Sequence, residues 1–128
     1  MHKILIVDDD ENIRELVRAT VEDEGFEVFE APDGNQALAM AREIQPDLII
    51  LDVMMPGKIG YHVCVELKQD KSIKTPYVIF LTARGTTIAQ MAGKSHGGDE
   101  YLTKPFEPEE LRQRVRNALK VKQKDPRD

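Results

Sequence analysis

The sequence predicts an α/β protein built on a doubly wound, mostly parallel sheet of five strands, with helices on both faces. Two observations predict this fold class. Short apolar runs alternate along the whole chain with segments whose apolar residues recur at helical spacing. One of the runs, DLIIL at residues 47–51, is continuously apolar after its first residue, which is typical of a strand covered on both faces.

Two strands and two helices are expected in the first half of the chain. Residues 3–7 (KILIV) form a short apolar run, and the helical pattern that follows can stop at Gly25. Residues 27–31 (EVFEA) alternate as a strand does, and the turn at 32–34 (Pro-Asp-Gly) leads into a second helix that Pro46 closes. The apolar stripes comprise Ile13, Leu16, Val17, Thr20 and Val21 in the first helix, and Ala37, Leu38, Ala41 and Ile44 in the second.

The second half continues the alternation after the strand at 47–51. Further strands are expected at 77–81 (YVIFL) and 100–104 (EYLTK), and helices over 61–68 and 108–120. The inward positions of these two helices are Val63, Cys64 and Leu67, and Leu111, Val115, Ala118 and Leu119. Between the last two strands, residues 84–98 contain four glycines, so a fourth helix there is expected to be short or mobile.

The composition is that of a single globular domain. The chain has 128 residues, of which 41% are hydrophobic and 32% charged, enough for a sizeable core. A net charge of −5 argues against nucleic acid as a direct partner of this domain. A single cysteine, Cys64, excludes an internal disulfide and fits a reducing compartment. The chain has no apolar run of membrane-spanning length and no signal-peptide core, so a cytoplasmic location is expected and no membrane partner.

Polar residues gather where the expected strands end. In an open parallel sheet, ligands bind outside the carboxyl ends of the strands, at the point where the strand order reverses. The residues at these ends are Asp8, Asp9 and Asp10 after the first strand, Asp52 after the third, Thr82 after the fourth and Lys104 at the fifth.

Three of these acids predict a cation site. If the first and third strands are neighbours, Asp8, Asp9 and Asp52 converge, and their mutual repulsion calls for a cation. Oxygen ligands with room for water favour a hard ion such as Mg²⁺. Asp10 is expected to cap the first helix instead.

Four motifs carry a resemblance to a known family. They are VDDD at 7–10, LDVMMPG at 51–57, LTA at 81–83 and YLTKPF at 101–106, in this order. With them the sequence resembles, over residues 3–122, the receiver domains of two-component response regulators, the CheY-like family. The resemblance implies a flavodoxin-like strand order of 2-1-3-4-5. Residues 123–128 are left as a polar tail or the start of a linker.

The resemblance assigns the acidic residues. It implies that Asp52 is the phosphoacceptor and that Mg²⁺ binds Asp9 and Asp52 directly. It also implies that Asp8 acts mainly through water, and that the main-chain carbonyl of Met54 completes the protein ligands. One departure from the family pattern is Ile59, where many receivers have Asp or Asn, so the start of the third helix lacks a capping side chain.

The resemblance also assigns the switch. Thr82 matches the hydroxyl that reaches the phosphoryl group, and Lys104 matches the lysine that contacts Asp52 and the phosphoryl oxygens. Tyr101 matches the aromatic residue that changes rotamer on activation. A cis peptide bond is expected between Lys104 and Pro105, as is usual in the family.

These roles imply a signalling domain rather than an enzyme, with at most an intrinsic Mg²⁺-dependent self-phosphorylation and dephosphorylation. The phosphoryl group would come from a sensor histidine kinase or a phosphotransfer protein. The face formed by the fourth helix, fifth strand and last helix would then control a downstream partner or effector domain, or form a homodimer. Solvent-exposed basic residues of the last helix would supply its cationic part, namely Arg112, Arg116 and Lys120.

Three other functions share parts of this pattern. A haloacid-dehalogenase-type phosphatase has a second acid two residues after its nucleophile, where this chain has Met54. A flavodoxin-like flavin carrier needs a phosphate loop rich in Ser and Thr after the first strand, where this chain has three acids. A receiver that acts only as a binding module, without taking phosphate, is opposed only by the intact acids, Thr82 and Lys104.

Overall fold

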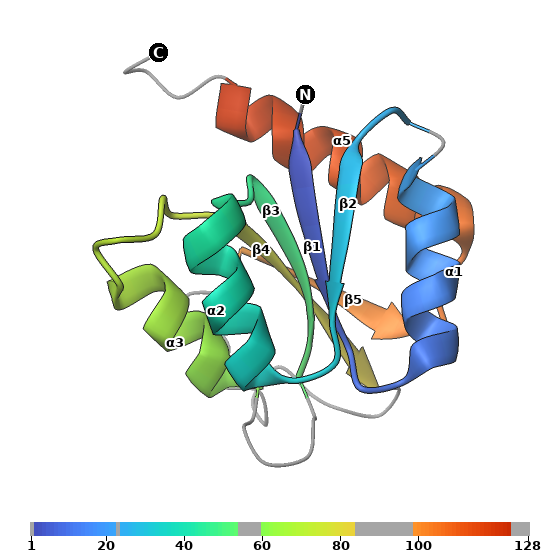
Figure 1. Cartoon of the computed structure of the whole chain (residues 1–128). Helices are drawn as coiled ribbons and strands as arrows, with labels where there is room; N and C mark the ends of the chain where they lie inside the picture. The colour runs from blue at the N-terminus through green and yellow to red at the C-terminus, as the bar shows by residue number, and fades with distance from the viewer. Residues whose placement is uncertain (1, 23, 54–59, 84–98, 124–128) are drawn as a thin grey trace.

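The computed structural model describes residues 2–22, 24–53, 60–83 and 99–123 (Figure 1). The expected fourth helix at 84–98 lies outside these residues. In chain order the elements are β1 (Lys3–Val7), α1 (Glu11–Glu22), β2 (Glu27–Ala31), α2 (Gly34–Ile44), β3 (Leu48–Asp52), α3 (Gly60–Gln69), β4 (Tyr77–Ala83), β5 (Glu100–Lys104) and α5 (Pro108–Gln123).

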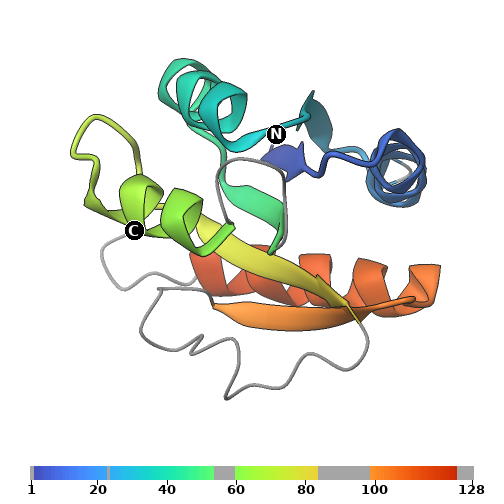
Figure 2. The same cartoon turned by 90° about the horizontal axis from the view of Figure 1, so that it is seen from below.

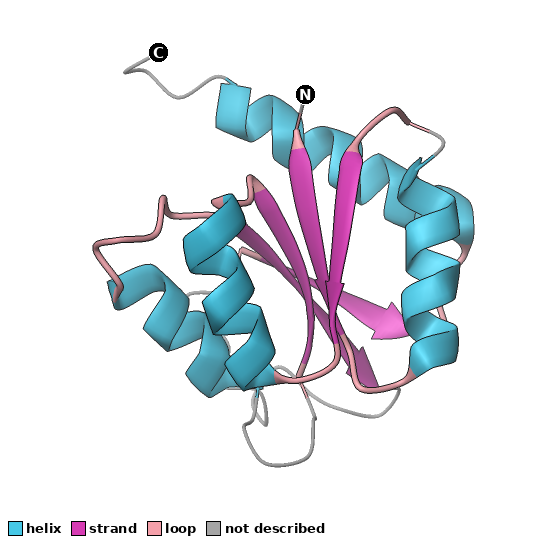
Figure 3. Cartoon of the chain, in the orientation of Figure 1, coloured by secondary structure: helices cyan, strands magenta, loops and turns pink. Residues whose placement is uncertain are grey.

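The described strands form one parallel sheet in the order β2-β1-β3-β4-β5, which confirms the predicted topology (Figures 1 and 3). The chain first adds β2 on one side of β1 and then continues with β3 on the other side. Val7 lies opposite Leu51 in the pairing of β1 with β3, and Asp52 lies opposite Leu81 in the pairing of β3 with β4. The carboxyl ends of these strands therefore share one edge of the sheet, next to the point where the strand order reverses.

Helices cover both faces of the sheet, as predicted (Figures 1 and 2). Alternate residues of each strand point to opposite faces and divide the interior into two cores. Leu5, Ile49 and Phe80 pack in the core beneath α2 and α3, whereas Ile6 and Ile50 pack in the core beneath α1 and α5. Burial of the central strands on both sides explains why their sequences read as continuous apolar runs.

Most of the predicted inward positions are buried. Residues Val63, Cys64 and Leu67 of α3 and Leu111, Val115, Ala118 and Leu119 of α5 all lie in the cores. Leu16 of α1 is an exception, because its exposure is 42%. It lies at the margin of the stripe whose centre is formed by Val17, Thr20 and Val21.

Several element boundaries differ from the predicted ones. β3 begins at Leu48 rather than Asp47 and includes Asp52, whose main chain still pairs with β4. β4 continues beyond Leu81 to Ala83, because Thr82 and Ala83 pair with Thr103 and Lys104 of β5. The helices are also longer than predicted. α3 begins at residue 60 and ends at residue 69, and α5 continues to residue 123.

The local signals at the first two helices act as expected. Oδ1 of Asp10 accepts the main-chain N–H of Asn12 at 2.9 Å and that of Ile13 at 3.4 Å, which confirms Asp10 as the cap of α1. Asp33 caps α2 in the same way, and α2 ends at Gln45 in a left-handed conformation with a φ of 53°. Among the described residues, no helix is long and apolar enough to cross a membrane.

Candidate functional site

The ends of β1 and β3 bring three carboxylates together, as the sequence predicted. Asp8 and Asp9 follow β1 directly, and Asp52 is the last residue of the neighbouring β3. One carboxylate oxygen from each of the three lies within 4.8 Å of the others. Asp8 and Asp52 are buried, whereas Asp9 is exposed. The cluster is thus open to solvent on the side of Asp9.

Lys104 enters this cluster from the end of β5. Its Nζ lies 3.0 Å from Oδ2 of Asp8 and 3.5 Å from Oδ1 of Asp52. Burial disfavours the ammonium form, but the hydrogen bond to Asp8 and the charge of Asp52 outweigh this effect and raise the pKa of Lys104. One ammonium faces three carboxylates, so the described part of the site keeps an excess of negative charge that a divalent cation would neutralise.

The oxygens of Asp8 are already engaged within the protein. Oδ1 accepts the main-chain N–H of Asp10 at 2.9 Å, and Oδ2 accepts from Lys104. Asp9 is exposed at the same strand end. Asp9 is therefore the more accessible of these two carboxylates.

Thr82 lies at the same edge of the sheet, one residue beyond the position opposite Asp52. Its side chain is buried, and it pairs in register with Thr103 of β5. Because strand residues alternate between faces, Thr82 shares its face of the sheet with Phe80. The ring of Tyr101 stacks on Phe80, with ring centroids 5.4 Å apart.

The hydroxyl of Tyr101 is buried without a hydrogen-bond partner among the described residues. Burial raises the pKa of this phenol above its ordinary value. Tyr101 is thus partly buried against the core, on the same face of the sheet as Thr82. The two predicted switch residues are positioned through the pairing of β4 with β5.

Other predicted features have mixed outcomes. The peptide bond between Lys104 and Pro105 is cis, which confirms the prediction. Cys64 is a buried core residue, and burial raises the pKa of its thiol to about 11, so it remains a thiol at neutral pH. Met54 and Ile59 lie outside the described residues.

Sequence reasoning missed the close approach of Gly60 to the end of β3. A Cβ at this position would overlap the main-chain carbonyl oxygen of Asp52 and lie 2.9 Å from Cα of Val53. The N–H of Gly60 also donates to the carbonyl of Val53 at 2.8 Å. The glycine that opens α3 is therefore required for space beside Asp52. Its place after LDVMMPG was the available signal, but the steric reason depends on the folded chain.

Comparisons with known proteins agree with this geometry. The family described as "Response regulator receiver domain" matches residues 4–116. The chain is 40% identical over 124 residues to the DNA-binding response regulator MtrA of Mycolicibacterium smegmatis, covering 97% of this chain and 53% of MtrA. It is 43% identical over 120 residues to the DNA-binding dual master transcriptional regulator RpaA of a Synechocystis strain, covering 94% of this chain and 50% of RpaA.

A solved structure extends the likeness to the fold. The chemotaxis response regulator CheY4 of Vibrio cholerae is 35% identical, with a TM-score of 0.85, covering 92% of this chain and 98% of that one. The chain spans about half the length of the curated relatives above. Together, the match over residues 4–116 and the shared sheet order place this chain in the family of response regulator receiver domains.

Proposed function

We propose that this chain is the phosphoacceptor domain of a two-component system, and that Asp52 accepts a phosphoryl group from a histidine kinase or a phosphotransfer protein. The observation that carries the proposal is the contact of Lys104 with Asp52 at the edge where Asp8 and Asp9 also lie. An oxygen of the Asp52 carboxylate forms a bond to phosphorus. At the same time the bond from phosphorus to the donor atom breaks, and the donor leaves with the electron pair.

The donor set fits Mg²⁺, because it offers carboxylate oxygens and leaves the side of Asp9 open to water. We assign its protein ligands to Asp9, Asp52 and the main-chain carbonyl of Met54, with Asp8 acting through water. When bound, the ion would neutralise charge on the transferred phosphoryl oxygens.

The chain's own residues supply the other parts. The Lys104 ammonium lies close enough to Asp52 to reach an oxygen of a group bonded to it, and its charge would stabilise the transfer. The Thr82 hydroxyl would donate to another of these oxygens. Movement of Thr82 would then act on Tyr101 through the shared face of β4 and β5. Through these contacts, the charge of a phosphoryl group on Asp52 would change the conformation of β5.

The output is proposed from the relatives. MtrA and RpaA are named as DNA-binding proteins, and the chain corresponds to about half of each. We propose that residues 3–122 form the receiver unit, that 123–128 are a tail or linker, and that a separate effector domain or partner protein reads its state. The face that includes β5 and α5 would bind that partner or a second copy. This assignment implies action in the cytoplasm, where a DNA-bound effector would work.

The acceptor is tested by incubation with acetyl phosphate and Mg²⁺, followed by measurement of the intact mass. Wild type should gain one phosphoryl group, and Asp52→Asn should gain none. Asp10→Asn is the matched control, because it removes a neighbouring carboxylate while Asn still caps α1. It should be labelled like wild type.

Two results would contradict the proposal in different ways. Labelling that persists in Asp52→Asn would refute Asp52 as the acceptor. If neither wild type nor Asp10→Asn is labelled, the alternative of a binding module that does not take phosphate would be favoured.

A further inference from the structure

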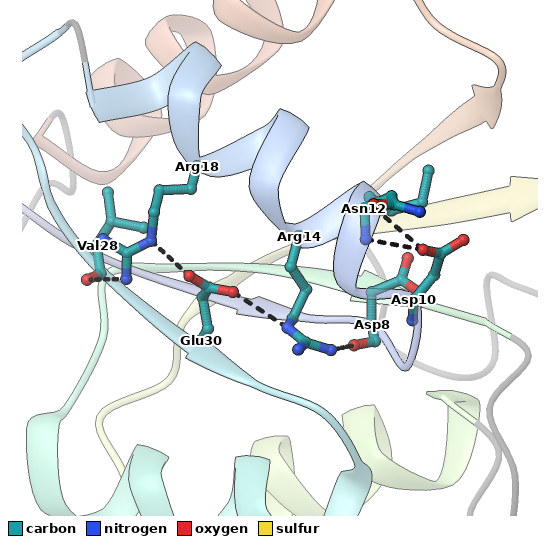
Figure 4. Close-up of polar contacts among 8 residues, drawn as sticks. Asp8, Asp10, Asn12, Arg14, Arg18, Val28 and Glu30 are labelled. Atoms are coloured by element: carbon teal, nitrogen blue, oxygen red, sulfur yellow. Dashed lines mark hydrogen bonds and ion pairs between the residues drawn. The ribbon is translucent and has the colours of Figure 1, made fainter.

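A chain of charged groups connects α1 and β2 and reaches the main chain of Asp8, at the end of β1 (Figure 4). Nε of Arg14 donates to Oε1 of Glu30 at 3.1 Å, and the other carboxylate oxygen of Glu30 accepts from Arg18. Arg18 also donates to the main-chain carbonyl of Val28 at 3.2 Å. Glu30 is therefore held between two arginines of one helix, and its own strand provides a further acceptor for Arg18.

Arg14 connects this chain of charges to the end of β1. Its Nη1 donates to the main-chain carbonyl oxygen of Asp8 at 2.7 Å. The guanidinium thus makes two bonds in different directions, one to Glu30 and one to Asp8. Its side chain is only 16% exposed, and a planar guanidinium can hold this geometry because its donors are fixed relative to one another.

The Asp8 carbonyl that accepts from Arg14 lies just beyond the last paired residue of β1. Val7 is the last residue of β1 that pairs with both neighbouring strands, and the N–H of Asp8 makes a longer bond of 3.3 Å to the carbonyl of Ala31. Asp9 follows immediately and is exposed. The direction in which the chain leaves β1, and with it the position of the two carboxylates, thus depends on contacts outside the ladder.

We propose that Arg14, oriented by Glu30, is a positioning residue for the divalent-cation site and acts through the main chain of Asp8. The proposal rests on the proposed function, because it concerns Mg²⁺ at Asp8, Asp9 and Asp52. Arg14 contacts the main chain of Asp8, and its guanidinium is positively charged and has no acceptor, so it is not a ligand.

Simple electrostatics predicts the opposite effect. Arg14 carries a positive charge near a cation site, so its removal should strengthen Mg²⁺ binding if charge alone matters. If Arg14 positions the acids, its removal should weaken binding. Partners outside the ligand shell that hold metal ligands commonly contribute about 10- to 100-fold in affinity. The sign of the change therefore separates the two roles.

The test is a calorimetric Mg²⁺ titration of wild type, Arg14→Gln, Arg14→Lys and Arg42→Gln, at a temperature where circular dichroism shows all of them folded. Arg14→Gln should bind about tenfold more weakly than wild type. Arg14→Lys keeps the charge but loses the guanidinium that donates to both Glu30 and the Asp8 carbonyl. It should therefore still bind Mg²⁺ several-fold more weakly than wild type. Arg42→Gln is the control, because it breaks an ion pair with Asp70 on the exposed side of α2 and should not change the affinity.

The role of Glu30 is tested by a double-mutant cycle. Glu30→Gln should weaken Mg²⁺ binding, and combining it with Arg14→Gln should weaken binding no further than Arg14→Gln alone.

A second measurement of the role of Arg14 needs no metal. Amide NMR shifts of Asp9 and Asp10 should move in metal-free Arg14→Gln and stay in place in Arg42→Gln.

The outcomes separate this inference from the proposed function. If wild type binds Mg²⁺ and Arg14→Gln binds it equally well or more tightly, the positioning role is wrong and the proposed function stands. If wild type binds no Mg²⁺, both are wrong. If Arg14→Gln does not fold, Arg14→Lys decides, since a wild-type affinity in that variant would overturn the role of the guanidinium.

Discussion

Two tyrosines on neighbouring strands are partly buried, and among the described residues only the hydroxyl of Tyr77 has an acceptor. Tyr77 on β4 donates to Oε2 of Glu100 at 2.7 Å, and Nη1 of Arg114 holds the other oxygen of that carboxylate at 2.8 Å. Tyr101 on β5 has a buried hydroxyl without a partner among the described residues. A buried polar group without a hydrogen bond costs stability, whereas a bond to a charged acceptor contributes to it. The two phenols should therefore respond oppositely to removal of their oxygen.

We predict that Tyr101→Phe raises the free energy of unfolding by up to about 1 kcal/mol, because the ring still stacks on Phe80 and only the unpaired hydroxyl is lost. Tyr77→Phe is the matched control and should lower it by about 1 to 2 kcal/mol. Urea unfolding followed by circular dichroism measures both. A loss of stability in Tyr101→Phe as large as that in Tyr77→Phe would show that the Tyr101 hydroxyl has an acceptor.

At the scale of single elements, the start of α3 is limited by space. We predict that Gly60→Ala lowers the free energy of unfolding by about 1 to 3 kcal/mol, because the added methyl overlaps the Asp52 carbonyl. The overlap should also displace Asp52 and slow its labelling by acetyl phosphate. Urea unfolding and the initial rate of the mass gain provide the two measurements.

Gly25→Ala is a control that separates the loss of stability in Gly60→Ala from its slower labelling of Asp52. Gly25 has a φ of 81°, and an added Cβ there meets no atom within 4 Å. Its replacement should cost about 1 to 2 kcal/mol through the backbone alone. Labelling of Asp52 should keep its wild-type rate. Slower labelling in both variants would mean that lost stability, rather than contact with Asp52, controls the rate.

The elements also show what sequence patterns can and cannot predict. Apolar periodicity located every described strand and helix, because burial requires it in a sheet covered on both faces. The strand ends were predicted less well, since Asp52 and Thr82 are polar and yet pair within the ladder. The link from Arg14 to Glu30 was missed because it depends on how α1 packs against β2, and no sequence spacing encodes that contact.

At the scale of the whole molecule, the parallel topology makes the candidate site predictable. The carboxyl ends of all parallel strands lie at one edge, so residues distant in sequence, such as Asp8 and Lys104, meet once the strand order is known. Among the described strands, β5 lies at the border of the sheet and pairs only with β4. The site thus combines residues from the ends of the central strands β1 and β3 with Lys104 from the border strand β5.

This position predicts where a signal from Asp52 should travel. Lys104 ends β5 and contacts both Asp8 and Asp52, so a phosphoryl group on Asp52 would compete with Asp8 for its ammonium. Movement of Lys104 should then alter β5, which has one strand neighbour, more than the central strands, which have two. Phosphorylation should shift an existing equilibrium at this edge rather than create a new fold.

We predict that acetyl phosphate and Mg²⁺ change amide hydrogen exchange most in the described residues 99–106, which contain β5, and least in α2. The α2 helix packs on α3 and on the opposite half of the sheet, and it contributes no residue to the acidic cluster (Figure 1). Exchange measured by mass spectrometry on wild type and on Asp52→Asn provides the test. The variant should show no change, because it lacks the acceptor. A change confined to α1 and α2 would place the output face away from Lys104 and β5.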